Sequence, residues 1–143
     1  MSQHRARALH DAEQNARDKA IGGVRTLAEA QGLTLGYPLG PADFPTLQKL
    51  YDGALATERL DPSRAISLGL ALGAVFHETG RFEWVRLFDS SGDETALGVP
   101  GRQYYLSPIS MIRKRLQAKE RVSLAALHSE IMRAVEERFG PAA

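Results

Sequence analysis

The stretch over residues 62–79 constrains the fold of this chain more than any other. Its spacing predicts a helix, and the apolar side chains lie on nearly every side of that helix: Ile66, Leu68, Leu70, Leu72, Val75 and Phe76. A helix that is apolar nearly all round is buried inside a domain. An Asp-Pro pair at its start and a glycine after its end are typical helix boundaries. We therefore expect a central buried helix, in which Gly69 and Gly73 form a flat strip that packs closely on a sheet.

The segment after this helix predicts a small antiparallel sheet. Residues 82–88 alternate with period two, so that Trp84 lies on one face and Val85 on the other. Turn sequences separate this strand from two more, over 94–99 and 102–106. Because short turns join antiparallel neighbours, we expect a three-stranded meander against which the central helix packs. We expect Trp84 to be largely buried, with its indole N–H hydrogen-bonded.

Four further helices are predicted around this core. An amphipathic but alanine-rich pattern covers residues 4–30, and Gly22-Gly23 predicts a bend or break within it. A second helix starts near residues 43–45, and two more, each beginning after a capping serine, cover 108–118 and 123–139. The expected fold class is α+β: three N-terminal helices, a three-stranded antiparallel meander and two C-terminal helices, with the helices packed mainly on one face of the sheet.

The length of 143 residues predicts a single domain over residues 1–143, with its core at 60–139. Residues 1–31 either join this core or form a peripheral helical arm, because their apolar stripe is thin. The longest apolar run, over 65–76, is too short to span a bilayer, and no signal-like apolar segment opens the sequence. We therefore expect a cytoplasmic protein without a membrane partner.

The composition removes several kinds of chemistry. The sequence has no cysteine, which excludes thiol catalysis, disulfides and iron–sulfur sites. His77-Glu78 begins like a zinc-protease motif, but Arg81 stands where the second histidine would lie. His128, beside apolar residues of the last helix, is expected to be half-buried. No catalytic, cofactor-binding or metal-ligating residue is predicted, and no cofactor is expected.

Positive charge is concentrated after residue 100, where eight basic and four acidic side chains follow. The densest group lies on the predicted helix over 108–118, with two more arginines expected nearby, and the predicted binding residues are Arg113, Lys114, Arg115, Arg102 and Arg121. Arginine offers bidentate recognition of carboxylates and lysine a point charge. We expect this cluster to bind a protein with an acidic surface or an anionic group; the alternative is a solvated helix face.

Four blocks of the sequence together resemble one protein family. They are Leu68-Gly69-Leu70-Ala71-Leu72-Gly73, Trp84-Val85, Asp89-Ser90-Ser91-Gly92-Asp93-Glu94 and Pro108-Ile109-Ser110-Met111-Ile112-Arg113-Lys114-Arg115-Leu116. Over about residues 60–135, the chain resembles the bacterial family called domain of unknown function 3806. The resemblance implies a short, single-domain bacterial protein and assigns no catalytic residue.

Three functions remain open at this point. The first is a non-catalytic protein-interaction module, of the kind found among immunity proteins and regulatory binding domains. The second is a small enzyme acting on a polar substrate, with carboxylates such as Glu78 or Glu83 as acid and base. The third is nucleic-acid binding through the basic helix, which the balanced net charge of +1 and the 7% aromatic content disfavour.

Overall fold

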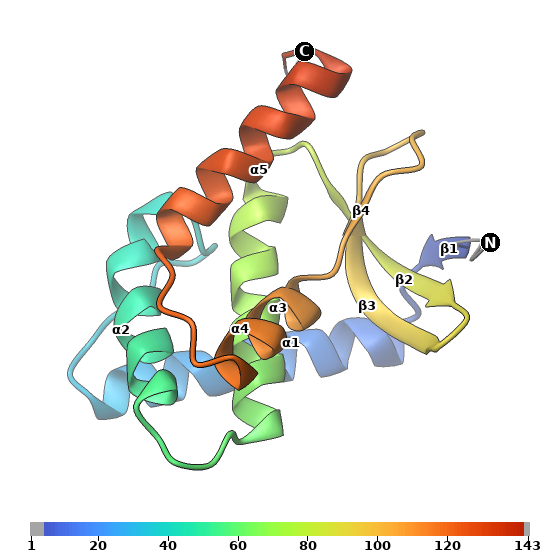
Figure 1. Cartoon of the computed structure of the whole chain (residues 1–143). Helices are drawn as coiled ribbons and strands as arrows, with labels where there is room; N and C mark the ends of the chain where they lie inside the picture. The colour runs from blue at the N-terminus through green and yellow to red at the C-terminus, as the bar shows by residue number, and fades with distance from the viewer. Residues whose placement is uncertain (1–4, 142–143) are drawn as a thin grey trace.

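The computed structural model describes residues 5–141, in which one strand is followed by three helices, three more strands and two final helices (Figure 1). The elements are β1 (Arg5–Ala8), α1 (Asp11–Ala30), a short 3-10 turn (Pro41–Asp43), α2 (Phe44–Leu55), α3 (Pro62–Glu78), β2 (Glu83–Asp89), β3 (Gly92–Gly98), β4 (Tyr105–Leu106), α4 (Pro108–Gln117) and α5 (Leu124–Phe139). The α+β class is confirmed. Helices α2 to α5 lie to one side of the sheet in Figure 1, and α1 reaches from that side to below β3 in this view.

The sheet has four strands in the described chain, in the order β1-β2-β3-β4, and every pair is antiparallel. The prediction of three strands was therefore wrong at its N-terminal edge. Residues 5–8, expected to open the first helix, instead pair with β2, so that Arg7 lies opposite Arg86. The alternation Arg-Ala-Arg-Ala suits a strand as well as a helix, and tertiary pairing decides between the two. The helix begins only at Asp11, where the His10 N–H donates to Glu13 Oε1 at 2.8 Å.

Helix α1 runs through Gly22 and Gly23 without a break, contrary to expectation. Its apolar side packs against α3, and Val24 and Ala28 are buried in the main core. This burial holds the helix together across the two glycines, because packing of an apolar face outweighs local propensity.

Helix α3 is the buried centre of the molecule, as predicted. Leu70, Leu72 and Val75 are each 4% exposed or less. The strip made by Gly69 and Gly73 does not meet the sheet along its whole length, however. A Cβ on Gly69 would meet the backbone of Ile109 at the start of α4, whereas one on Gly73 would meet the Trp84 ring and Pro108. Gly69 therefore allows α4 to approach α3, and only Gly73 allows a residue of the sheet to approach it.

Trp84 differs from its prediction. It is half-buried, not largely buried, with its ring between Gly73 on one side and the Arg17 guanidinium 5.2 Å from the ring centroid. Within residues 5–141, its indole N–H has no hydrogen-bond partner.

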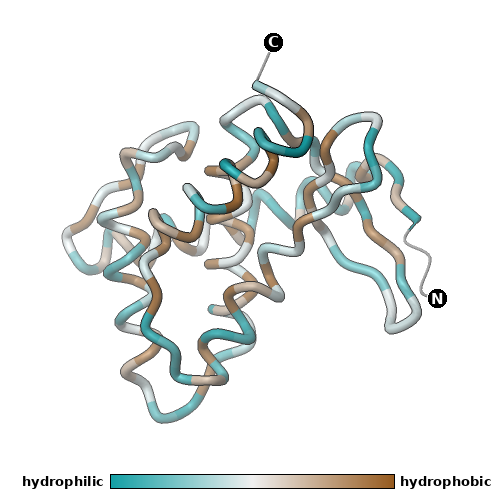
Figure 2. The backbone as a smooth tube through the Cα atoms, turned by 45° about the horizontal axis from the view of Figure 1, so that its top comes forward, coloured by the Kyte–Doolittle hydropathy of each residue, from teal (hydrophilic) through white to brown (hydrophobic). Residues whose placement is uncertain are grey.

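The helices turn their apolar sides towards one another and their polar sides outwards (Figure 2). No helix of the described chain is long and apolar enough to cross a membrane.

Candidate functional site

The five predicted binding residues lie on three separate surfaces. Arg113 and Lys114 are exposed on α4. Arg102 lies in the loop between β3 and β4, with its guanidinium 5.2 Å from the centroid of the Phe139 ring. Arg121 lies in the linker between α4 and α5.

Arg115 faces the interior more than its two neighbours do. It is half-buried, and its Nη1 donates to the Met111 carbonyl at 3.1 Å. Its Nε is buried without a hydrogen-bond partner in the described chain, and its charge acts on the buried Tyr51 of α2. The outer face of α4 is thus formed by Arg113 and Lys114, because Arg115 packs towards α2.

A hollow of about 580 Å³ lies between α1, α3, α4 and the β2–β3 hairpin, and we call it the helix–hairpin groove. Its apolar lining comes from all three helices: Ala16, Ala20, Ile66, Leu70 and Ile109. Ile66 is 39% exposed, so part of its aliphatic side chain is open to solvent in this groove. An apolar lining with polar residues around it is typical of binding sites.

Three arginines line the same groove, and they differ in how far they are already paired. Arg86 is fully engaged: its Nε lies 2.7 Å from Asp93 Oδ2, and its Nη1 donates to Thr95 Oγ1 at 3.1 Å. Arg17 covers the Trp84 ring, and its Nε lies 3.0 Å from Asp18 Oδ1.

Arg113 is the least engaged of the three arginines. Its Nη2 makes one long contact of 3.5 Å to Ser110 Oγ. No carboxylate within residues 5–141 pairs with it, so its guanidinium keeps nearly all its donors for a ligand.

An ion-pair network fixes the groove at the start of α1. Glu13 accepts two hydrogen bonds from Arg7, at 2.7 and 3.0 Å, and lies 3.6 Å from Arg86 Nε. These bonds, with that from the His10 N–H, hold the pKa of Glu13 at about 2. The network therefore stays charged at neutral pH and joins the start of α1 to Arg86 of β2.

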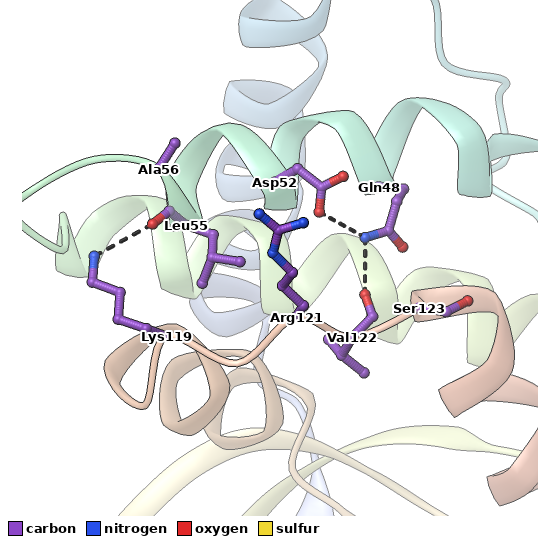
Figure 3. Close-up of a pocket in the computed structure, with 8 residues that line it drawn as sticks. All are labelled: Gln48, Asp52, Leu55, Ala56, Lys119, Arg121, Val122 and Ser123. Atoms are coloured by element: carbon purple, nitrogen blue, oxygen red, sulfur yellow. Dashed lines mark hydrogen bonds between the residues drawn. The ribbon is translucent and has the colours of Figure 1, made fainter.

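A second hollow, of about 670 Å³, lies between α2 and the linker that joins α4 to α5 (Figure 3). Gln48 holds this linker with both ends of its amide: Nε2 donates to the Val122 carbonyl and Oε1 accepts from the Leu124 N–H. Lys119 Nζ donates to the Thr57 carbonyl at 2.7 Å, and the Tyr51 hydroxyl donates to the Glu120 carbonyl at 2.6 Å.

We call Gln48, Tyr51 and Lys119 the linker latch. Arg121 extends from the linker towards α2 in Figure 3. The side chains of the latch donate their hydrogen bonds to backbone carbonyls of the linker and of the turn after α2. This hollow is therefore organised chiefly as a structural joint.

The other residues considered as acid–base or metal candidates lie at the surface. His77, Glu78 and Glu83 are exposed. In the described part of the chain, no group of three or more histidine, aspartate or glutamate side chains could hold a metal ion.

His128 is more buried than predicted, at 8% exposure. It lies between the Phe44 and Phe76 rings, with centroids 5.2 and 4.6 Å away, and this burial lowers its pKa.

Of the residues that line the groove, only Arg113 was among the predicted binding residues. The apolar pattern of the central helix predicts that Ile66 is buried. No sequence motif marks Arg17. A signal was available for Ile66 alone, since it is the first large apolar residue of a helix whose start is otherwise polar.

The fold has a relative among solved structures. A crystal structure from Bacteroides thetaiotaomicron VPI-5482 matches with a TM-score of 0.76 and 14% sequence identity. The match covers 90% of this chain and 47% of that one, so the chain spans less than half the length of its structural neighbour. At this identity the likeness shows the fold alone.

The family comparison agrees with the resemblance seen in the sequence. No curated protein matches significantly. The model of the family described as "Domain of unknown function (DUF3806)" matches residues 43–128, which include α2, α3, the β2–β4 strands, α4 and the first residues of α5. Because this match covers more than half of the sequence, the chain belongs to the family of domain of unknown function 3806.

Proposed function

We propose that this protein is a non-catalytic binding module that takes an acidic and apolar segment of another protein into the helix–hairpin groove. The observation that carries the proposal is the position of Arg113 beside an apolar lining that includes the exposed Ile66. In this proposal the protein is a bacterial, cytoplasmic binding domain that resembles immunity proteins or regulatory domains in its role.

The groove is lined by three arginines and also by the carboxylates of Asp89, Asp93 and Glu94 on the hairpin side, so an acidic partner is favoured only on the α4 side, beside Arg113. An apolar side chain of the partner would cover Ile66 and Ile109, and a carboxylate beside it would accept from the Arg113 guanidinium. Arg17, which is half-buried over Trp84, is a second cation on the α1 side. Arg86 contributes less, because Asp93 and Glu13 already neutralise it.

The experiment is a titration of isotopically labelled protein with short peptides, followed by amide chemical shifts. The peptides carry Glu-Leu or Asp-Phe pairs, and matched peptides carry lysine in place of the acid. We expect shifts at Ile66, Ile109 and Arg113 with the acidic peptides only. Binding should weaken with added salt, because exposed charges are screened within about 8 Å at physiological ionic strength.

Two variants locate the interaction. Arg113→Glu should lower affinity about tenfold or more, as expected when a charged hydrogen-bond partner is reversed. Arg133→Glu makes the same charge change on an exposed residue of α5, which does not line the groove, and should leave affinity nearly unchanged. Equal losses in both variants, or shifts that avoid the groove, contradict the proposal. Binding of an RNA or DNA duplex that Arg113→Glu abolishes would contradict it in favour of nucleic acid.

A further inference from the structure

Strand β1 leaves one edge of the sheet open. It pairs with β2 on one side through residues 5–8, and no strand of the described chain pairs with its other side. An open edge presents backbone N–H and C=O groups that an extended segment of another chain can pair with. Arg5, Ala6 and Ala8 are exposed along this edge, and Arg7 is half-buried.

The side chains at this edge define a small site outside the helix–hairpin groove. Arg5 lies opposite Phe88 and Arg7 opposite Arg86, so the two arginines of β1 share one face. Phe88 is 36% exposed, with the Arg7 guanidinium 5.4 Å from its ring centroid. Arg5, Ala6, Arg7 and Phe88 line a hollow of about 370 Å³.

The charges at the edge are unequally satisfied. Arg7 is held by Glu13 through two hydrogen bonds. Arg5 is exposed and has no carboxylate partner within residues 5–141. The face of β1 that carries both arginines therefore has an unmatched positive charge next to an exposed aromatic ring.

We propose that the open edge of β1 binds an extended acidic segment of a partner protein, which adds to the sheet as a strand. Backbone hydrogen bonds to β1 supply the affinity, and alternate acidic side chains of the segment lie beside Arg5 and Arg7. An apolar side chain of the segment covers Phe88. The proposal goes beyond the groove described above, because it uses a different surface and a different mode of recognition.

A second copy of this chain suits the edge less well than an acidic segment. Pairing β1 with β1 of another copy would bring the Arg5 and Arg7 side chains of both copies together, and like charges on neighbouring strands are destabilising. Acidic side chains at the same positions are stabilising instead. Charge complementarity therefore favours an acidic segment over a second copy of this chain.

The test uses the whole protein and a capped peptide of about eight residues in which glutamate alternates with valine, a length typical of strands. A peptide alternating lysine with valine keeps the strand propensity and reverses the charge. A third peptide carries the glutamate–valine sequence with N-methyl groups on alternate residues, which removes ladder donors. Amide hydrogen exchange of residues 5–8 and amide shifts report on the edge.

We expect the glutamate–valine peptide to slow exchange at β1 by about tenfold, and the other two peptides to have little effect. Arg5→Glu should weaken binding of that peptide by about fivefold, a size expected for reversal of a cross-strand charge. Arg133→Glu is the matched control and should not change it. The Arg5 side chain makes no hydrogen bond in the described chain, so its variant should keep the melting temperature of the wild type.

The outcomes separate this proposal from the groove. Shifts confined to Ile66 and Arg113 would overturn strand addition and leave the groove proposal standing. Equal binding of the N-methylated peptide would also overturn it, because the backbone ladder would then be irrelevant. Concentration-dependent dimerisation that protects β1 amides would assign the edge to a second copy and overturn the acidic partner.

Discussion

Gly69 and Ile109 approach so closely that a Cβ added to the glycine would stand 2.5 Å from the isoleucine Cα and 2.9 Å from its backbone nitrogen. Both contacts are to backbone atoms, so no side chain can rotate away. This approach seats the start of α4 on α3 and thereby brings Ile109 and Arg113 to the helix–hairpin groove.

Gly69→Ala should therefore force α4 away from α3. We expect a loss of about 1–3 kcal/mol in the free energy of unfolding, the usual cost of overpacking a core. Gly22→Ala is the control, since a Cβ there meets nothing within 4 Å, and it should stabilise the protein by about 0.5–1 kcal/mol. Urea denaturation of both variants measures the difference. A neutral Gly69→Ala would show that the two helices do not need this contact.

Protonation of His128 should destabilise the fold. Burial lowers its pKa in the folded state, so the unfolded chain binds the proton more readily. The free energy of unfolding should then fall as the pH drops from about 7 to about 5. His128→Leu should flatten this part of the pH profile, whereas the exposed His77→Ala should leave it as in the wild type. An identical slope in all three proteins would mean that His128 is not the group responsible.

Glu13 should make the free energy of unfolding depend on pH in a more acidic range than His128 does. Its folded-state pKa of about 2 lies below its ordinary value, so its contribution to stability is present above the ordinary value and is lost as the pH falls towards 2. Glu13→Gln should reduce the loss of stability between about pH 5 and about pH 2. Glu29→Gln, on the exposed side of the same helix, is the control and should retain the wild-type profile. Thermal melts across this pH range provide the measurement.

Removing the Tyr51 hydroxyl should loosen the linker latch. Tyr51→Phe deletes the 2.6 Å hydrogen bond to the Glu120 carbonyl, at an expected cost of about 1 kcal/mol. Faster amide exchange should follow in residues 118–123, because their hold on α2 is weakened. Tyr37→Phe serves as the control, since Tyr37 is 93% exposed, and it should change stability by less than about 0.5 kcal/mol.

Helices α3 and α5 were predictable from local signals, whereas Ser107, predicted to cap α4, makes no side-chain capping hydrogen bond. Asp61 and Ser123 cap α3 and α5 through their side chains, as their positions before the apolar runs indicated. The hairpin of β2 and β3 followed from alternation on both sides of a turn. Each of these patterns involves residues near one another in the sequence.

The edge strand and the groove were not predictable in the same way. Residues 5–8 alternate arginine with alanine, a pattern that suits a helix as well as a strand, and their pairing partner lies beyond three helices along the chain. The groove combines Ala16, Ile66 and Ile109 from three elements, whose meeting depends on the close approach at Gly69. The unexpected half-burial of Arg115 likewise depends on an element distant in the sequence, since its charge acts on Tyr51 of α2.

The pairing of β1 with β2 also sets an order for folding. The β2–β3 hairpin closes through a short turn, so it can form early and without the rest of the chain. β1 must wait until α1, α2 and α3 have been synthesised and its partner strand has emerged, and closing so long a loop costs entropy before any contact is made. On the ribosome, the first strand of the sheet to be made therefore stays unpaired until β2 has emerged.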